Sequence, residues 1–108
     1  MDVDFQELTD VANERTRQAT AYLEFLRAPS MSAGVYVLPA GGVDTQSPHP
    51  QDELYYVVRG KARMRAAAQD RPVSQGTLIF VAANVEHRFH DIEEELTLLV
   101  FFAPAETG

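Results

Sequence analysis

The chain has 108 residues, a length that suits one domain with a single hydrophobic core. It contains no cysteine, which excludes disulfides, thiolate metal sites and cysteine nucleophiles, so any metal must be held by nitrogen and oxygen ligands. The formal net charge of -7 argues against a nucleic acid or an anionic membrane as a partner. We expect a cytoplasmic protein, because no apolar run could span a bilayer and the acidic start lacks the pattern of a signal peptide.

The first part of the chain predicts a short helix over residues 4–16. Phe5, Leu8 and Val11 recur at helical spacing between mostly polar positions. Acidic side chains come early and arginines late, as the helix dipole favours. Residues 20–27 are dense in apolar and aromatic side chains, and we predict a strand here, with a continuation of the helix as the alternative.

Most of the remaining chain predicts short strands separated by turns. The expected strands are residues 31–38, 54–58, 62–67, 73, 77–81, 87–90 and 96–102. The expected turns are residues 39–42, 60–61, 69–72, 75–76 and 91–95. Residues 43–50 cannot form a regular central strand, because Pro48 and Pro50 lack the N–H that a ladder needs. One helix and about eight short strands indicate an all-β sandwich or barrel.

Candidate metal ligands lie around the middle of the chain. His49 and Glu53 are four residues apart in an extended segment, so their side chains point to the same face. His87 follows a strand and a loop of small residues, and it is the third candidate. Each histidine alone would more often be a surface or core residue. Together, two histidines and one carboxylate can occupy one side of a metal and leave positions open for water and substrate.

The first half of this pattern resembles the first motif of the cupin family. That motif has a glycine, two histidines separated by one residue, a glutamate and a closing glycine. This chain has Gly41, Ser47, His49, Glu53 and Gly60 at the corresponding spacing. The leading histidine of the family is therefore replaced by Ser47.

The second half is similar to the second cupin motif. That motif has a glycine, a Pro-x-Gly turn, a histidine and an asparagine. This chain has Gly76, Ala82, Asn84, His87 and Asp91 at the same spacing. Asparagine tolerates a left-handed turn, so the loop can survive the loss of proline and glycine.

The resemblance covers about residues 33–104 and implies a double-stranded β-helix, the jelly-roll barrel of cupins, with a short N-terminal helix. We expect a single domain over residues 1–108, with the helix and first strand in residues 4–27 and the barrel in about residues 31–104. The four-ligand site of the family is reduced here to His49, Glu53 and His87. The amide oxygen of Gln46 is our candidate for the place left by Ser47.

Other residues of the two motif strands have expected roles. Tyr55 shares strand parity with Glu53 and should face inward, where it could orient or protonate a bound ligand. The alternative is a packing tyrosine whose hydroxyl is hydrogen-bonded. Phe89 shares parity with His87 and should line the cavity, and Gln51 could support the neighbouring ligands.

Four basic residues alternate along the predicted strands and should share a face. They are Arg59, Lys61, Arg63 and Arg65. We interpret them as a solvated face whose charges prevent edge-to-edge pairing. Recognition of a small acid is the alternative.

The sequence thus predicts a metal-binding cupin with a small-molecule ligand and a divalent transition metal, which could be Zn, Fe, Mn, Ni or Cu. The resemblance implies a homodimer. As an enzyme, the protein would be a dioxygenase or an isomerase acting on a small organic acid or an aromatic compound. The alternatives are a non-catalytic ligand-binding or sensor cupin, and a cupin that has lost its metal together with the histidine at Ser47.

Overall fold

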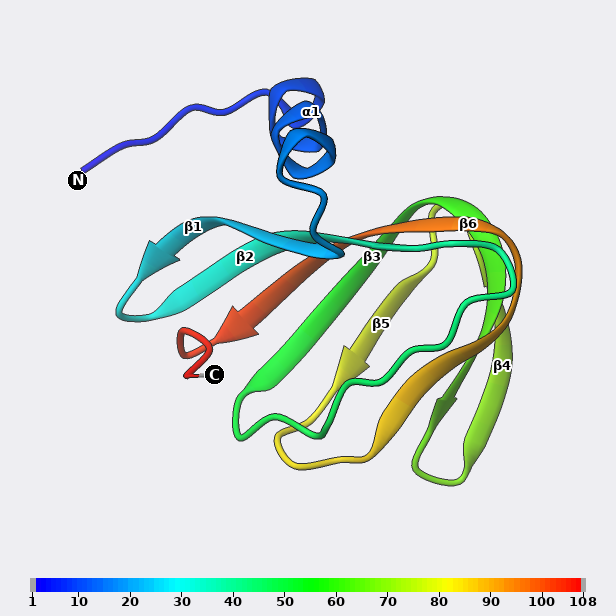
Figure 1. Ribbon diagram of the computed structural model, residues 1–108. Helices are drawn as coiled ribbons and strands as arrows, with labels where there is room; N and C mark the ends of the chain where they lie inside the picture. Colours follow the sequence, from blue (N-terminus) through cyan, green and yellow to red (C-terminus); the bar gives the residue numbers. More distant parts are fainter. Residues whose placement is uncertain (1, 108) are drawn as a thin grey trace.

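The computed structural model describes residues 2–107, and in these residues it contains one helix and six strands (Figure 1). The elements in chain order are α1 (Leu8–Gln18), β1 (Tyr22–Ala28), β2 (Met31–Leu38), β3 (Asp52–Ala66), β4 (Gln69–Ser74), β5 (Leu78–Val81) and β6 (His87–Ala103). The predicted all-β class with a short N-terminal helix is confirmed. The segment 20–27, which fitted a strand or a helix, belongs to a strand.

All strand pairs are antiparallel, and the sheet order is β1-β2-β6-β3-β4, with β5 also paired to β3. The two longest strands, β3 and β6, pair with each other along most of their length and bend together (Figure 1). The first half of β3 pairs with β5 and its second half pairs with β4. The sheet therefore curls into a jelly-roll barrel, as predicted.

The turn predicted at residues 60–61 is wrong, because β3 continues through it. The β3–β6 pairing shifts register between Val57 and Arg63, and Gly60 has a φ of 108° in the middle of the irregular stretch. Inward-facing residues are odd-numbered before this point, as at Val57, and even-numbered after it, as at Ala62. The glycine signal therefore marks a bulged bend within a strand, where long-range pairing with β6 keeps the chain extended.

The acidic turn predicted at residues 91–95 is also wrong, because β6 runs through it as a continuous strand. Its inward-facing side changes in the same way, from odd-numbered Phe89 to even-numbered Ile92, across Asp91 with a φ of 49°. The turn predicted at residues 69–72 lies two residues earlier, and β4 begins at Gln69. The helix begins at Leu8 rather than at residue 4.

The core fills the inside of the barrel. Its fully buried members come from the inward faces of β3 and β6 above all, and they include Tyr55, Val57, Leu96 and Leu98. The C-terminal segment after β6 folds back over β1 and β2, where the backbone N–H of Glu106 donates to Ser32 Oγ at 2.9 Å. This hydrogen bond ties the segment to β2.

The outer face of β3 and β5 exposes large apolar side chains. Leu54 lies opposite Phe80 and Tyr56 lies opposite Leu78 in the strand register. Leu78 and Phe80 remain 66% and 65% exposed. Within residues 2–107, α1 is too short and too polar to cross a bilayer.

We predict that Gly60→Ala destabilises the protein much more than Gly76→Ala, as measured by urea unfolding. Both glycines have a positive φ, so each substitution carries a backbone cost of about 1 kcal/mol. A Cβ at Gly60 would also lie 2.3 Å from the carbonyl oxygen of Glu95, whereas a Cβ at Gly76 meets nothing within 4 Å. We expect a total loss of about 3 kcal/mol at Gly60. Equal losses at the two positions would contradict the close approach of β3 and β6.

Candidate functional site

The polar residues of the site are brought together by the connection between β2 and β3, residues 39–51. This connection runs back alongside β6 before entering β3 (Figure 1). The N–H of Gly41 donates to the carbonyl of Ile92 at 2.8 Å, and the N–H of Asn84 donates to the carbonyl of His49 at 2.7 Å. The irregular, proline-containing segment is thus fixed at both ends against the rest of the barrel.

Asp44 anchors the middle of this connection. Its side chain is buried, with 3% exposed, and it accepts four hydrogen bonds. The Tyr36 hydroxyl donates to Oδ1 at 2.9 Å, and the Phe89 backbone N–H donates to Oδ2 at 3.0 Å. Gln46 donates its backbone N–H to Oδ1 at 3.3 Å and its side-chain Nε2 to Oδ2 at 3.0 Å. Sequence reasoning missed Asp44, because a lone acid in an irregular loop carries no periodicity and belongs to neither motif.

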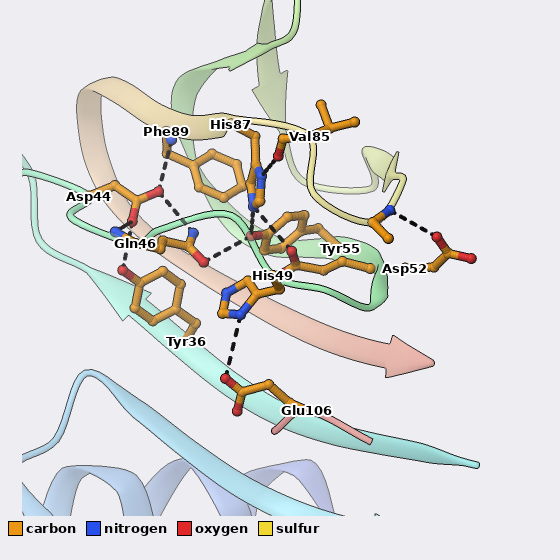
Figure 2. A network of polar contacts seen from close by, with 12 residues as sticks. Tyr36, Asp44, Gln46, His49, Asp52, Tyr55, Val85, His87, Phe89 and Glu106 are labelled. Carbon is orange, nitrogen blue, oxygen red and sulfur yellow. Dashed lines mark hydrogen bonds and ion pairs between the residues drawn. The ribbon is translucent and has the colours of Figure 1, made fainter. Parts of the chain in front are cut away.

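A directed chain of hydrogen bonds leads from Asp44 into the barrel (Figure 2). Because a carboxylate only accepts, Gln46 must present its NH₂ group to Asp44, and its Oε1 then faces Tyr55. The Tyr55 hydroxyl therefore donates its one proton to Gln46 Oε1, at 3.2 Å. The Tyr55 oxygen can then only accept a further hydrogen bond, and His87 Nε2 lies 3.0 Å from it.

The hydrogen bonds of His87 also require its ring to carry a positive charge. Its Nδ1 lies 2.8 Å from the carbonyl oxygen of Val85 and must donate to it, while its Nε2 must donate to Tyr55. Both ring nitrogens then carry protons. Burial opposes this charged form, but the neighbouring Glu53 carboxylate and the Val85 carbonyl outweigh it and raise the pKa of His87 above its usual value.

Glu53 supplies the opposite charge. Its side chain is 2% exposed, and Oε1 lies 3.1 Å from His87 Nε2. Among residues 2–107, no group meets hydrogen-bond geometry at either buried carboxylate oxygen, so the contact with His87 is an ion pair. A buried carboxylate is costly unless a cation compensates it. The site therefore needs a positive charge next to Glu53, and a proton on His87 or a metal ion can supply it.

His49 lies apart from this pair. Its Nδ1 is 3.6 Å from Glu106 Oε2, and its ring packs edge-on against Phe102 with the centroids 4.9 Å apart. The ring centroids of His49 and His87 are 6.4 Å apart. Among residues 2–107, no three His, Asp or Glu side chains are grouped closely enough to hold a metal. The structure thus brings Glu53, His87 and the candidate Gln46 together, and the complete ligand set stays a prediction.

Tyr55 faces inward as predicted and is fully buried. Burial and the charge of Glu53 raise its pKa well above 10, so the hydroxyl keeps its proton at neutral pH and acts as a donor. Phe89 packs against it edge to face, with the ring centroids 5.1 Å apart. Gln51 is buried as expected, but its Nε2 donates to Thr107 Oγ1 at 2.9 Å rather than to Glu53 or His49.

A pocket of about 210 Å³ lies beside these residues. Its lining is mostly aromatic and aliphatic, with polar atoms from His49, Gln46 and Glu106. The lining residues are Tyr22, Tyr36, Gln46, His49, Val100, Phe102 and Glu106. The pocket therefore reaches the polar chain at Gln46 and is suited to a small organic molecule.

Residues 34–103 match the cupin domain family. This range takes up more than half of the 108 residues and contains Glu53, Tyr55 and His87. The chain belongs to the cupin family, as the two motifs indicated.

Comparison with other proteins agrees with this family. An uncharacterized protein of Streptomyces coelicolor is 44% identical over 100 residues, which cover 93% of this chain and 95% of that protein. A crystal structure of a protein from Thermus thermophilus superposes with a TM-score of 0.73 at 20% identity, covering 95% of this chain and 99% of the other.

An RmlC-like cupin with a double-stranded β-helix fold from Methanocaldococcus jannaschii superposes with a TM-score of 0.69. It is 18% identical, and the match covers 77% of this chain and 78% of that one. At such identities the structural likeness establishes the fold alone, and it confirms the predicted double-stranded β-helix.

We predict that Asp44→Ala lowers the free energy of unfolding by about 3 kcal/mol, because it leaves a buried donor on Phe89 and half-buried donors on Tyr36 and Gln46 without an acceptor. Urea unfolding measures the loss. Thr45→Ala is the matched control, since Thr45 is exposed on the same connection. A change at Asp44 no larger than that at Thr45 would show that the connection does not depend on this carboxylate.

Proposed function

We propose that this protein is a small-molecule-binding cupin that holds a divalent metal ion at Glu53 and His87. The observation that carries the proposal is the buried Glu53 carboxylate, whose two oxygens accept no hydrogen bond from any group in residues 2–107. His87 places its Nε2 3.1 Å from that carboxylate. An imidazole and a carboxylate side by side form a suitable donor pair for Zn, Fe, Mn, Ni or Cu.

The neighbouring contacts also support this proposal. His87 donates its Nδ1–H to the carbonyl of Val85, an arrangement typical of metal-binding histidines because it directs Nε2 toward the ion. A metal would replace the proton on Nε2 and supply the positive charge that Glu53 requires. His49 and the amide oxygen of Gln46 are the further proposed ligands.

The reaction proposed for such a centre is oxidation or isomerisation of a small organic acid or aromatic compound. When bound, the ion would act as a Lewis acid or, if it is iron or copper, as a centre for oxygen chemistry. Tyr55 would keep its proton in the hydrogen bond to Gln46 Oε1, and its oxygen would accept a hydrogen bond from a donor group of the ligand. Asp44 and Gln46 would fix the orientation of the Tyr55 hydroxyl. The surrounding apolar core would exclude water from the site.

The alternative proposal is a non-catalytic binding module. It is favoured by the 210 Å³ pocket, which is mostly apolar and approaches the buried pair only through Gln46 and His49. In this version the protein would bind a small ligand and act through a partner. Cupin folds carry many unrelated functions, so the fold gives neither proposal an advantage.

The metal proposal predicts that the protein, purified without an affinity tag, binds one divalent ion per chain. Calorimetric titration with Mn²⁺ and Zn²⁺ measures the affinity. We expect Glu53→Gln to weaken binding at least about tenfold, because the isosteric amide lacks the negative charge. Glu94→Gln makes the same charge change on the exposed face of β6, where Glu94 lies 3.7 Å from Lys61, and this variant should bind the ion as the wild type does.

Two outcomes would contradict the metal proposal. One is metal content far below one ion per chain in the untagged protein. The other is an affinity that neither Glu53→Gln nor His49→Ala changes. If the ion is present, oxygen uptake across a panel of small acids and phenols separates the two functions. Tight binding without turnover would favour the binding module.

We also propose a homodimer, and the exposed apolar face of β3 and β5 supports it. Light scattering on a size-exclusion column should give the mass of two chains for the wild type. Phe80→Glu should give the mass of one chain, because a charge on this face would be buried in the dimer. Thr45→Glu carries the same charge elsewhere on the surface and should remain dimeric. A wild-type protein with the mass of one chain would contradict the proposal.

A further inference from the structure

A second pocket, of about 350 Å³, borders the candidate site at Gln46 and His87. Its other lining residues are Pro48, Arg65, Ala67, Glu86 and Arg88. It shares only Gln46 with the 210 Å³ pocket, so the two hollows approach the same hydrogen-bonded chain separately.

Two arginines face each other at this second pocket. Arg65 on β3 and Arg88 on β6 are directly opposite in the strand register. Like charges in this position destabilise a sheet unless something compensates them. Arg65 has a single ion pair, 3.4 Å long, to Asp70. Among residues 2–107, no carboxylate lies within ion-pair distance of Arg88, and Glu86 pairs with neither arginine although it lines the same pocket.

The surrounding charges do not neutralise this pair. The one carboxylate that Arg65 contacts, Asp70, also accepts from Arg63 at 3.0 Å and lies 3.0 Å from His90. Asp70 is thus shared among Arg63, Arg65 and His90, and among residues 2–107 it is the one carboxylate paired with either arginine of the pocket. Guanidinium groups are planar, and their paired N–H donors match the two oxygens of a carboxylate.

We propose that this second pocket binds the carboxylate of a small organic acid between Arg65 and Arg88, with the body of the acid directed toward Gln46 and His87. The apolar walls at Pro48 and Ala67 suit an organic body better than a bare inorganic ion. The inference deepens the proposed function, on which it rests for the chemistry at His87. Binding of the acid itself requires no metal.

The test is a titration of ¹⁵N-labelled, metal-free protein with benzoate and succinate, followed by amide chemical shifts. We expect saturable shifts that are largest at the backbone amides of Ala67 and Arg88. Benzamide has the shape of benzoate without its charge and should produce none. Arg65→Gln and Arg88→Gln should each weaken benzoate binding about tenfold, because each removes one charged donor pair. Arg71→Gln removes an exposed arginine outside the pocket and should have no effect.

The inference is overturned if neither acid binds saturably to the wild type, if benzamide binds as tightly as benzoate, or if both pocket variants keep the wild-type affinity. Metal titration of the same samples separates this inference from the metal proposal. Arginine-dependent benzoate binding in a protein that takes up no metal would sustain the anion site and end the metal proposal. Metal binding without benzoate binding would support the metal proposal and overturn the anion site.

Discussion

The buried carboxylate of Asp44 is the interaction on which the arrangement of the site depends. A carboxylate can only accept hydrogen bonds, and this one accepts four. It ties the β2–β3 connection to β6 and decides which end of the Gln46 amide faces Tyr55. The direction of every later hydrogen bond follows from that choice, through to the two protons on His87 (Figure 2).

The direction of these hydrogen bonds favours one positive charge in the barrel interior, at His87. This place is at His87 Nε2, which lies 3.0 Å from the Tyr55 hydroxyl and 3.1 Å from Glu53 Oε1. A proton on His87 compensates the charge of the buried carboxylate, and the divalent ion that we propose would do so with one more positive charge.

The bends of β3 and β6 decide what each of these residues faces. In β3 the inward side changes from odd to even positions across Gly60, and in β6 it changes across Asp91. Glu53 and Arg65 have the same parity, yet one is buried and the other is exposed. Without the bulge, the arginines of β3 would point into the core, where an unpaired charge is prohibitively costly.

Local information in the sequence determined the strand-rich architecture, the inward position of Tyr55 and the family. These features are predicted by patterns within a few neighbouring positions, namely alternating side chains, turn residues and the two spaced motifs. Only the tertiary structure decided that Gly60 lies in a bend rather than a turn, that Asp44 closes the polar chain and that His49 faces Glu106. Each of these depends on a contact between residues far apart in the sequence, such as Gly60 with Glu95 and Asp44 with Phe89. No local pattern encodes such contacts, because long-range pairing overrides the preference of a short segment.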